Sequence, residues 1–165
     1  MKRIFVVRHA KSSWGDLTLP DHARPLNERG RRDAPIMAAL CVERNHVPDM
    51  IICSNAKRAR ETSEYFVKAF GLNPQSFRLE SGLYHAPSDK YFEEAILIDD
   101  IHSSVMMFGH NPGITYLANE VSSTFVDNVP TCGILIIESS ANAWSDVDIS
   151  NCKLLDFLYP KMLVK

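Results

Sequence analysis

The sequence predicts a three-layer α/β fold in which a mixed, largely parallel sheet lies between two layers of helices. Short apolar runs at 4–7, 50–53 and 105–108 have the character of buried strands. Segments whose apolar residues repeat at three and four positions lie between these runs, as in amphipathic helices. Strands that alternate with helices over 165 residues indicate one domain, 1–165, whose sheet is covered on both faces.

The first apolar run, Ile4 to Val7, ends abruptly at Arg8 and His9. Ligands of open α/β sheets bind just beyond the carboxyl ends of the strands. A guanidinium presents a planar set of donors to phosphate oxygens, and a neutral imidazole is a nucleophile near neutral pH. The pair therefore suggests phosphoryl transfer with His9 as nucleophile, although a solvated Arg and His would give the same dipeptide. Residues 11–26 have a loop composition and should border this site.

A helix is predicted after Asn27, which is a favourable N-cap. Pro35 lies inside its pattern, so the helix should either bend there or begin its regular part near Asp33. Its expected buried positions repeat at intervals of three and four residues: Ile36, Met37, Leu40 and Cys41.

The second strand, 50–53, is followed by Ser54, which we expect to cap a helix that ends at Gly71. The buried stripe of that helix should contain Ala59, Ser63, Phe66 and Phe70. A weak strand is predicted at 77–79. Ser88 should cap a further helix that runs to about residue 98, with three residues facing inward: Phe92, Ala95 and Ile96.

The strand at 105–108 leads into Gly109 and His110 and then into another helix. The buried face of that helix should contain Ile114, Leu117, Ala118 and Val121. Residues 134–137 and 154–158 complete the predicted sheet as two more strands.

Composition indicates an ordinary globular protein, with 45% hydrophobic and 23% charged residues. The formal net charge of -2 gives no general attraction for nucleic acid or an anionic membrane, so neither is an expected partner. No CxxC pair occurs among the four cysteines, which argues against a zinc ribbon or a thioredoxin-like motif. The first apolar run is too short for a signal peptide or a membrane span. We therefore expect a cytoplasmic protein without a metal or other cofactor.

Three of the predicted strands end in polar clusters: Arg8 with His9, Ser54 with Arg58, and His110. Neighbouring parallel strands would bring these clusters to one end of the sheet. The four-residue spacing from Ser54 to Arg58 would place both on one face of a helix start, where free N–H groups favour an anion.

These residues lie in motifs that resemble those of the histidine phosphatase superfamily, with its phosphoglycerate mutase-like fold, and in particular the small SixA-type phosphohistidine phosphatases. The motifs are Val7-Arg8-His9-Ala10-Lys11-Ser12, the S-x-x-x-R-A-x-x-T pattern over 54–62, and Gly109-His110-Asn111-Pro112. Supporting matches at Arg24-Pro25-Leu26, Leu83-Tyr84 and Pro130-Thr131 extend the resemblance over nearly the whole chain.

The resemblance implies that His9 is the phosphorylated nucleophile and that Arg8, Arg58 and His110 bind the phosphoryl oxygens. Nearby guanidiniums would disfavour a protonated His9 and would stabilise the charge that develops on those oxygens. His110, if protonated, would add a third cationic donor. No metal ion is then required to neutralise the phosphate.

Two further residues are expected at the site. Ser54 would add its hydroxyl to the phosphate-binding set, and Arg24 would contact the substrate from the bordering loop. The other arginines of this region, Arg29, Arg31 and Arg32, fit the exposed start of a helix.

The substrate class depends on the leaving group. Relatives that cleave phosphate esters generally use an additional acid on an inserted segment, and this chain offers only Glu80, which could equally be a solvated carboxylate. Because imidazole leaves more easily than an alkoxide, the sequence favours hydrolysis of phosphohistidine on a signalling or phosphorelay protein. The alternatives are a phosphomonoesterase for a small phosphorylated metabolite and a non-catalytic phosphate-binding module. The sequence leaves the oligomeric state open.

Overall fold

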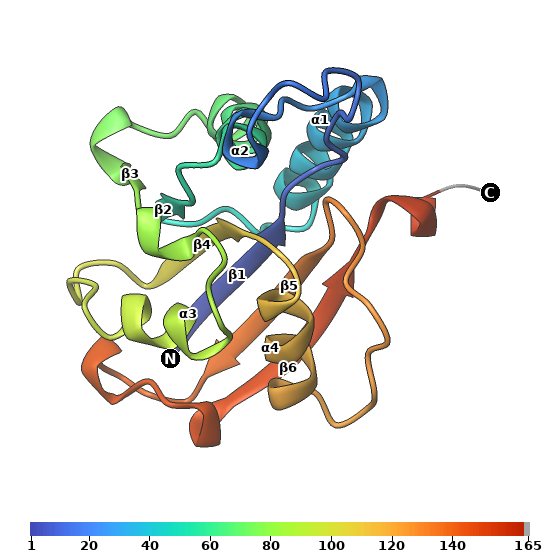
Figure 1. The fold of residues 1–165 in the computed structure, drawn as a ribbon. Helices are drawn as coiled ribbons and strands as arrows, with labels where there is room; N and C mark the ends of the chain where they lie inside the picture. Colours follow the sequence, from blue (N-terminus) through green and yellow to red (C-terminus); the bar gives the residue numbers. More distant parts are fainter. Residues whose placement is uncertain (164–165) are drawn as a thin grey trace.

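Six strands form one mixed sheet in the computed structural model, which describes residues 1–163; their order is β3-β2-β4-β1-β5-β6 (Figure 1). The strands are β1 (Lys2–Arg8), β2 (Met50–Cys53), β3 (Phe77–Leu79), β4 (Ser104–Gly109), β5 (Ile134–Ser139) and β6 (Cys152–Leu158). The strands β3, β2, β4 and β1 run parallel to one another, whereas β5 is antiparallel to both of its neighbours, β1 and β6. The predicted fold class and all six predicted strands are confirmed.

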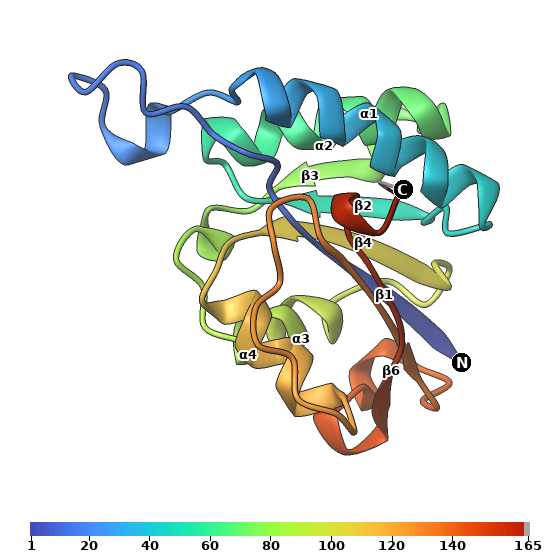
Figure 2. The same cartoon turned by 90° about the vertical axis from the view of Figure 1, so that its right-hand side faces the viewer.

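Helices cover both faces of the sheet, with α1 (Glu28–Glu43) and α2 (Lys57–Phe70) on one face and α3 (Asp89–Ala95) and α4 (Gly113–Val121) on the other (Figure 2). Successive residues of a strand point to opposite faces. Accordingly, Phe5 and Val7 of β1 belong to the apolar cluster under α1 and α2, while Ile4 and Val6 belong to the cluster under α3 and α4. The central strand is therefore buried on both sides.

The start of α1 is fixed by Asn27, whose side chain accepts a hydrogen bond from the N–H of Gly30. The helix continues through Pro35, so the alternative in which its regular part begins near Asp33 is wrong. Both Asp33 and Ala34 are buried, and this packing together with the cap holds the first turns in place. Gly30 is required here, because a Cβ would overlap the carbonyl oxygen of Lys11. The absence of a side chain at this position lets α1 lie against the segment that follows His9.

Two of the predicted inward-facing residues are on the surface instead. Ile36 of α1 and Ile96 beyond α3 are exposed, whereas Met37, Leu40, Cys41 and Ala95 are buried as expected. The third predicted helix ends at Ala95 rather than near residue 98, and the Ser88 hydroxyl binds Glu120 instead of capping it. All four predicted buried positions of α4 are confirmed.

Ser54 does not cap α2, contrary to our expectation. Its N–H donates to the carbonyl oxygen of Phe108 at 3.0 Å, so the chain continues as an extension of β2 past the strand end. The helix begins at Lys57, and its other end is the predicted one, at Gly71 with φ of 61°. No helix within residues 1–163 has both the length and the hydrophobicity needed to cross a bilayer.

Candidate active site

The polar clusters predicted at three strand ends come together at one edge of the sheet. Arg8 at the end of β1 is in register with Gly109 of β4, and Cys53 at the end of β2 is in register with Phe108. The residue that follows β1 is therefore His9, the residue that follows β4 is His110, and the residue that follows β2 is Ser54. The imidazole centroids of His9 and His110 lie 5.2 Å apart.

His9 is buried, and its hydrogen bonds define one tautomer. Its Nδ1 lies 2.7 Å from the carbonyl oxygen of Ala10, and because a carbonyl oxygen only accepts, Nδ1 carries the proton. The lone pair is therefore on Nε2, which accepts from Nε of Arg58 at 3.4 Å. Burial lowers the pKa of His9 to about 3, with further lowering by Arg58 and Arg8 and an opposing effect of the Ala10 bond. At neutral pH the ring is thus an uncharged base with its lone pair at Nε2.

Arg58, on the first turn of α2, is only 5% exposed and connects His9 to the loop between β1 and α1. Its Nη1 donates to the main-chain oxygen of Asp21 at 2.8 Å, and its Nη2 donates to the carboxylate of Asp21 at 3.0 Å. Thr62, one turn later, donates to the Arg58 carbonyl and accepts from the N–H of Ala10. This pair of bonds sets the distance between α2 and the turn that carries His9.

Arg8 and His110 each keep a buried nitrogen without a hydrogen-bond partner among residues 1–163. In Arg8 this atom is Nε, while Nη1 donates to the carbonyl of Val129 at 2.9 Å. In His110 it is Nδ1, while Nε2 lies 2.8 Å from the hydroxyl of Ser54. Unsatisfied buried polar atoms are rare, so each is a candidate contact for a ligand atom.

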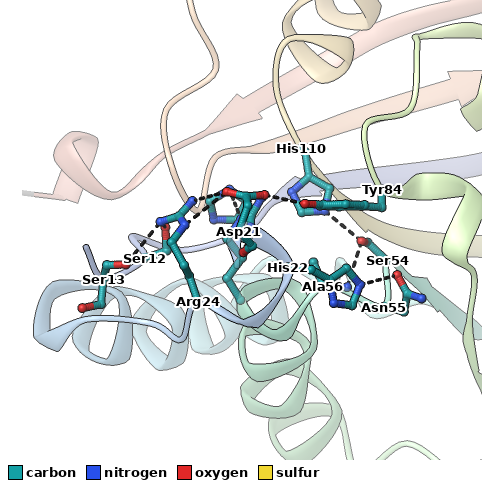
Figure 3. Close-up of polar contacts among 12 residues, drawn as sticks. Ser12, Ser13, Asp21, His22, Arg24, Ser54, Asn55, Ala56, Tyr84 and His110 are labelled. Carbon is teal, nitrogen blue, oxygen red and sulfur yellow. Dashed lines mark hydrogen bonds and ion pairs between the residues drawn. The ribbon is translucent and has the colours of Figure 1, made fainter. Parts of the chain in front are cut away.

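His110 is neutral in this structure, so it does not add the third positive charge considered from the sequence. Burial, followed by the proximity of His9 and Arg58, lowers its pKa to about 2. Ser54 contacts this ring rather than standing at a helix start, and its hydroxyl also accepts from the N–H of Ala56 at 3.3 Å (Figure 3). With the Ser54 hydroxyl as the donor to Nε2, the proton of the neutral His110 ring lies on Nδ1.

Arg24 lies beside the site with all three side-chain nitrogens bound to loop atoms. Nη1 donates to the hydroxyl of Ser12 at 2.7 Å, while Nε and Nη2 donate to Oδ1 of Asp21 (Figure 3). Its guanidinium also stacks on Trp14, 3.7 Å from the ring centroid. Arg24 therefore organises the bordering loop, and a direct contact with substrate stays a prediction.

Asp21 is the residue that the sequence analysis missed. Its carboxylate accepts from Arg24, from Arg58 and from the hydroxyl of Tyr84 at 2.5 Å (Figure 3). The Tyr84 hydrogen bond and the two arginines hold the pKa of Asp21 well below its usual range. The available signal was an acid three residues before Arg24, in a loop expected to border the site.

The remaining candidates lie outside this group. The carboxylate of Glu80 accepts from the N–H of Gly82 at 3.0 Å and so caps a short 3₁₀ turn. Arg29 pairs with Asp33 at the start of α1. Within residues 1–163, no group of three His, Cys, Asp or Glu side chains is arranged to hold a metal ion.

Residues 4–83 match the family described as histidine phosphatase superfamily (branch 1). An uncharacterised chloroplastic protein of Arabidopsis thaliana is 30% identical over 162 residues, covering 88% of this chain and 70% of that protein. An uncharacterised protein of Mycobacterium tuberculosis is 28% identical over 165 residues, covering 94% of this chain and all of its own.

Solved structures are similar over nearly the full length. A protein of Agrobacterium tumefaciens assigned as the phosphohistidine phosphatase SixA has a TM-score of 0.78 and 29% identity, with 96% of this chain and 99% of that chain covered. The protein histidine phosphatase SixA in complex with tungstate has the same fold, with a TM-score of 0.81 at 21% identity over 98% of this chain and 99% of its own. Together with the convergence of His9 and His110 at the sheet edge, these matches show that the chain belongs to the histidine phosphatase superfamily and is a phosphatase of the SixA type.

Proposed function

We propose that this phosphatase hydrolyses phosphohistidine on a signalling or phosphorelay protein through a phosphorylated His9. The observation that carries the proposal is the state of the His9 ring, with its Nδ1 proton held by Ala10 and its Nε2 lone pair beside Arg58. A neutral, oriented imidazole next to a guanidinium is what attack on a phosphoryl group requires.

In the first step Nε2 of His9 attacks phosphorus, and the bond from phosphorus to the substrate imidazole breaks. The electron pair of that bond leaves with the substrate ring. Nε of Arg8 and Nδ1 of His110, which lack partners among the described residues, are the donors we assign to the phosphoryl oxygens together with Arg58. Water then attacks the phosphorus of phosphorylated His9, releasing phosphate and restoring the neutral ring with its proton still on Nδ1.

Leaving-group chemistry supports a phosphohistidine substrate over an ester. An ester needs a proton donor for the departing oxygen, but Asp21 is held in its ionised form by Tyr84 and two arginines. Glu80 is engaged as a turn cap. An imidazole that is protonated on its other nitrogen departs as a neutral base and needs no such donor. The 29% identity to the A. tumefaciens protein supports the same choice.

The test is a comparison of substrates for the purified protein in the presence of EDTA. We expect faster turnover of a phosphohistidine-bearing protein than of any member of a panel of phosphate esters. Preference for an ester would overturn the phosphohistidine assignment and would place the protein among metabolite phosphatases. Binding of vanadate with no turnover of any substrate would indicate a phosphate-binding module.

A further inference from the structure

The loop between β1 and α1 stands out from the body of the molecule (Figure 2). Three of its large apolar side chains, which we call the apolar tip, are exposed. Trp14 is 63% exposed, and Leu17, at 86%, is the most exposed large hydrophobic residue of the described chain. Leu19 is exposed as well. Surface apolar residues gathered on one projecting segment are typical of an interaction site.

Hydrogen bonds hold this tip in a defined shape. The carboxylate of Asp16 accepts from the N–H of Thr18 at 2.9 Å and from its hydroxyl, which closes the turn that presents Leu17. At the base of the loop, the N–H of Ser13 donates to the carbonyl of Pro25 at 2.8 Å. A surface formed before binding loses less conformational entropy when a partner docks.

The apolar tip is continuous with the catalytic site. Trp14 stacks on Arg24, Arg24 binds Asp21, and Asp21 binds Arg58, whose Nε contacts His9. The side chain of Asp21 is 41% exposed, so solvent reaches the site on the side where this loop lies. The loop that carries the tip therefore borders the side from which solvent reaches Asp21.

We infer that Trp14, Leu17 and Leu19 form a docking surface for a partner protein that presents apolar side chains beside its phosphohistidine. The inference rests on the proposed function and adds to it the kind of partner. The arginines and histidines recognise the phosphoryl group, which is small and polar, whereas the apolar tip has no counterpart on a small phosphorylated metabolite. A second copy of this chain seated on the tip would cover the access to His9.

The test uses two substrates, a histidine-containing phosphotransfer domain phosphorylated on histidine and free phosphohistidine. Leu17→Ser removes an apolar side chain that makes no hydrogen bond to the site, and Ile101→Ser is its control. Ile101 is 80% exposed and lies before the amino end of β4, at the opposite edge of the sheet from His9. We expect Leu17→Ser to raise the KM for the domain about tenfold and to leave free phosphohistidine within about twofold of wild type. Ile101→Ser should change neither.

Equal effects of Leu17→Ser on both substrates, or no effect on either, would overturn the docking surface while leaving the proposed function intact. If the wild-type protein hydrolysed neither phosphohistidine substrate, both the docking surface and the proposed function would be overturned. Sedimentation would identify a different occupant: a dimer that Leu17→Ser converts to a monomer would show that the tip binds a second copy and would also overturn the inference.

Discussion

Asp21 holds both terminal nitrogens of Arg58, one through its main-chain oxygen at 2.8 Å and the other through its carboxylate at 3.0 Å. The same guanidinium contacts Nε2 of His9 through its Nε atom. An acid from the loop between β1 and α1 thereby positions the arginine that lies against the proposed nucleophile.

Asp21→Asn should lower kcat/KM about tenfold, because a neutral amide lacks the charge that orients the buried guanidinium of Arg58. The effect is limited to this size because the side chain at position 21 is partly exposed to water. Steady-state kinetics measures the change. Asp16→Asn, assayed like Asp21→Asn with free phosphohistidine, is the matched control, since the carboxylate of this acid in the same loop binds only Thr18. An Asp21→Asn enzyme with wild-type kcat/KM would show that Arg58 keeps its place without the carboxylate.

His9→Ala should abolish turnover and leave the fold intact, because the variant lacks the proposed nucleophile while the strand that carries it stays buried. Rapid quenching of the wild-type enzyme with labelled substrate should trap an acid-labile phosphoenzyme that is missing from the variant. His102→Ala serves as the control, because the imidazole of His102 makes no hydrogen bond in the described structure. An acid-labile phosphate that maps to another residue would refute the mechanism.

Ser54→Ala should reduce kcat about fivefold, because it removes one hydrogen bond that orients His110 and such a bond contributes about 1 kcal/mol. The ¹⁵N chemical shifts of the His110 ring should change at the same time, because its tautomer loses the partner that fixes it. Ser63→Ala removes an equally buried hydroxyl that donates to the Arg60 carbonyl and does not contact His110, and it should have wild-type kinetics. Unchanged kcat in Ser54→Ala would mean that packing alone orients the ring.

Stability should rise with pH between about 3 and 6.5 because of the two site histidines. Burial lowers the pKa of His9 to about 3 and that of His110 to about 2, so both stay unprotonated when folded. The unfolded chain binds their protons below pH about 6.5, so each contributes a slope of up to about 1.4 kcal/mol per pH unit. Urea denaturation should therefore give a shallower pH dependence for His110→Gln than for wild type. An identical slope would mean that His110 is protonated in the folded protein.

Local chemistry in the sequence determined the strands, the layers and most of the site. A short apolar run that is buried on both faces fits best as a strand of a sheet with helices on both sides, so β1, β2 and β4 were predictable. The polar residues that follow such runs meet at one edge once the strands are parallel, which is why Arg8, His9, Arg58 and His110 could be predicted to lie together. Single positions at element ends were less certain, since Ser54 has the chemistry of a helix cap but continues β2.

Only the tertiary structure decided the protonation and the partners of the site residues. The neutral state of His110 follows from burial, and the tautomer of His9 from the Ala10 carbonyl, neither of which a sequence pattern contains. Asp21 enters the site because the loop between β1 and α1 folds back on α2 and brings its carboxylate to Arg58 and Tyr84, residues far away along the chain. Residue order specifies which groups are available, whereas burial and long-range contacts determine which of them are charged and what they bind.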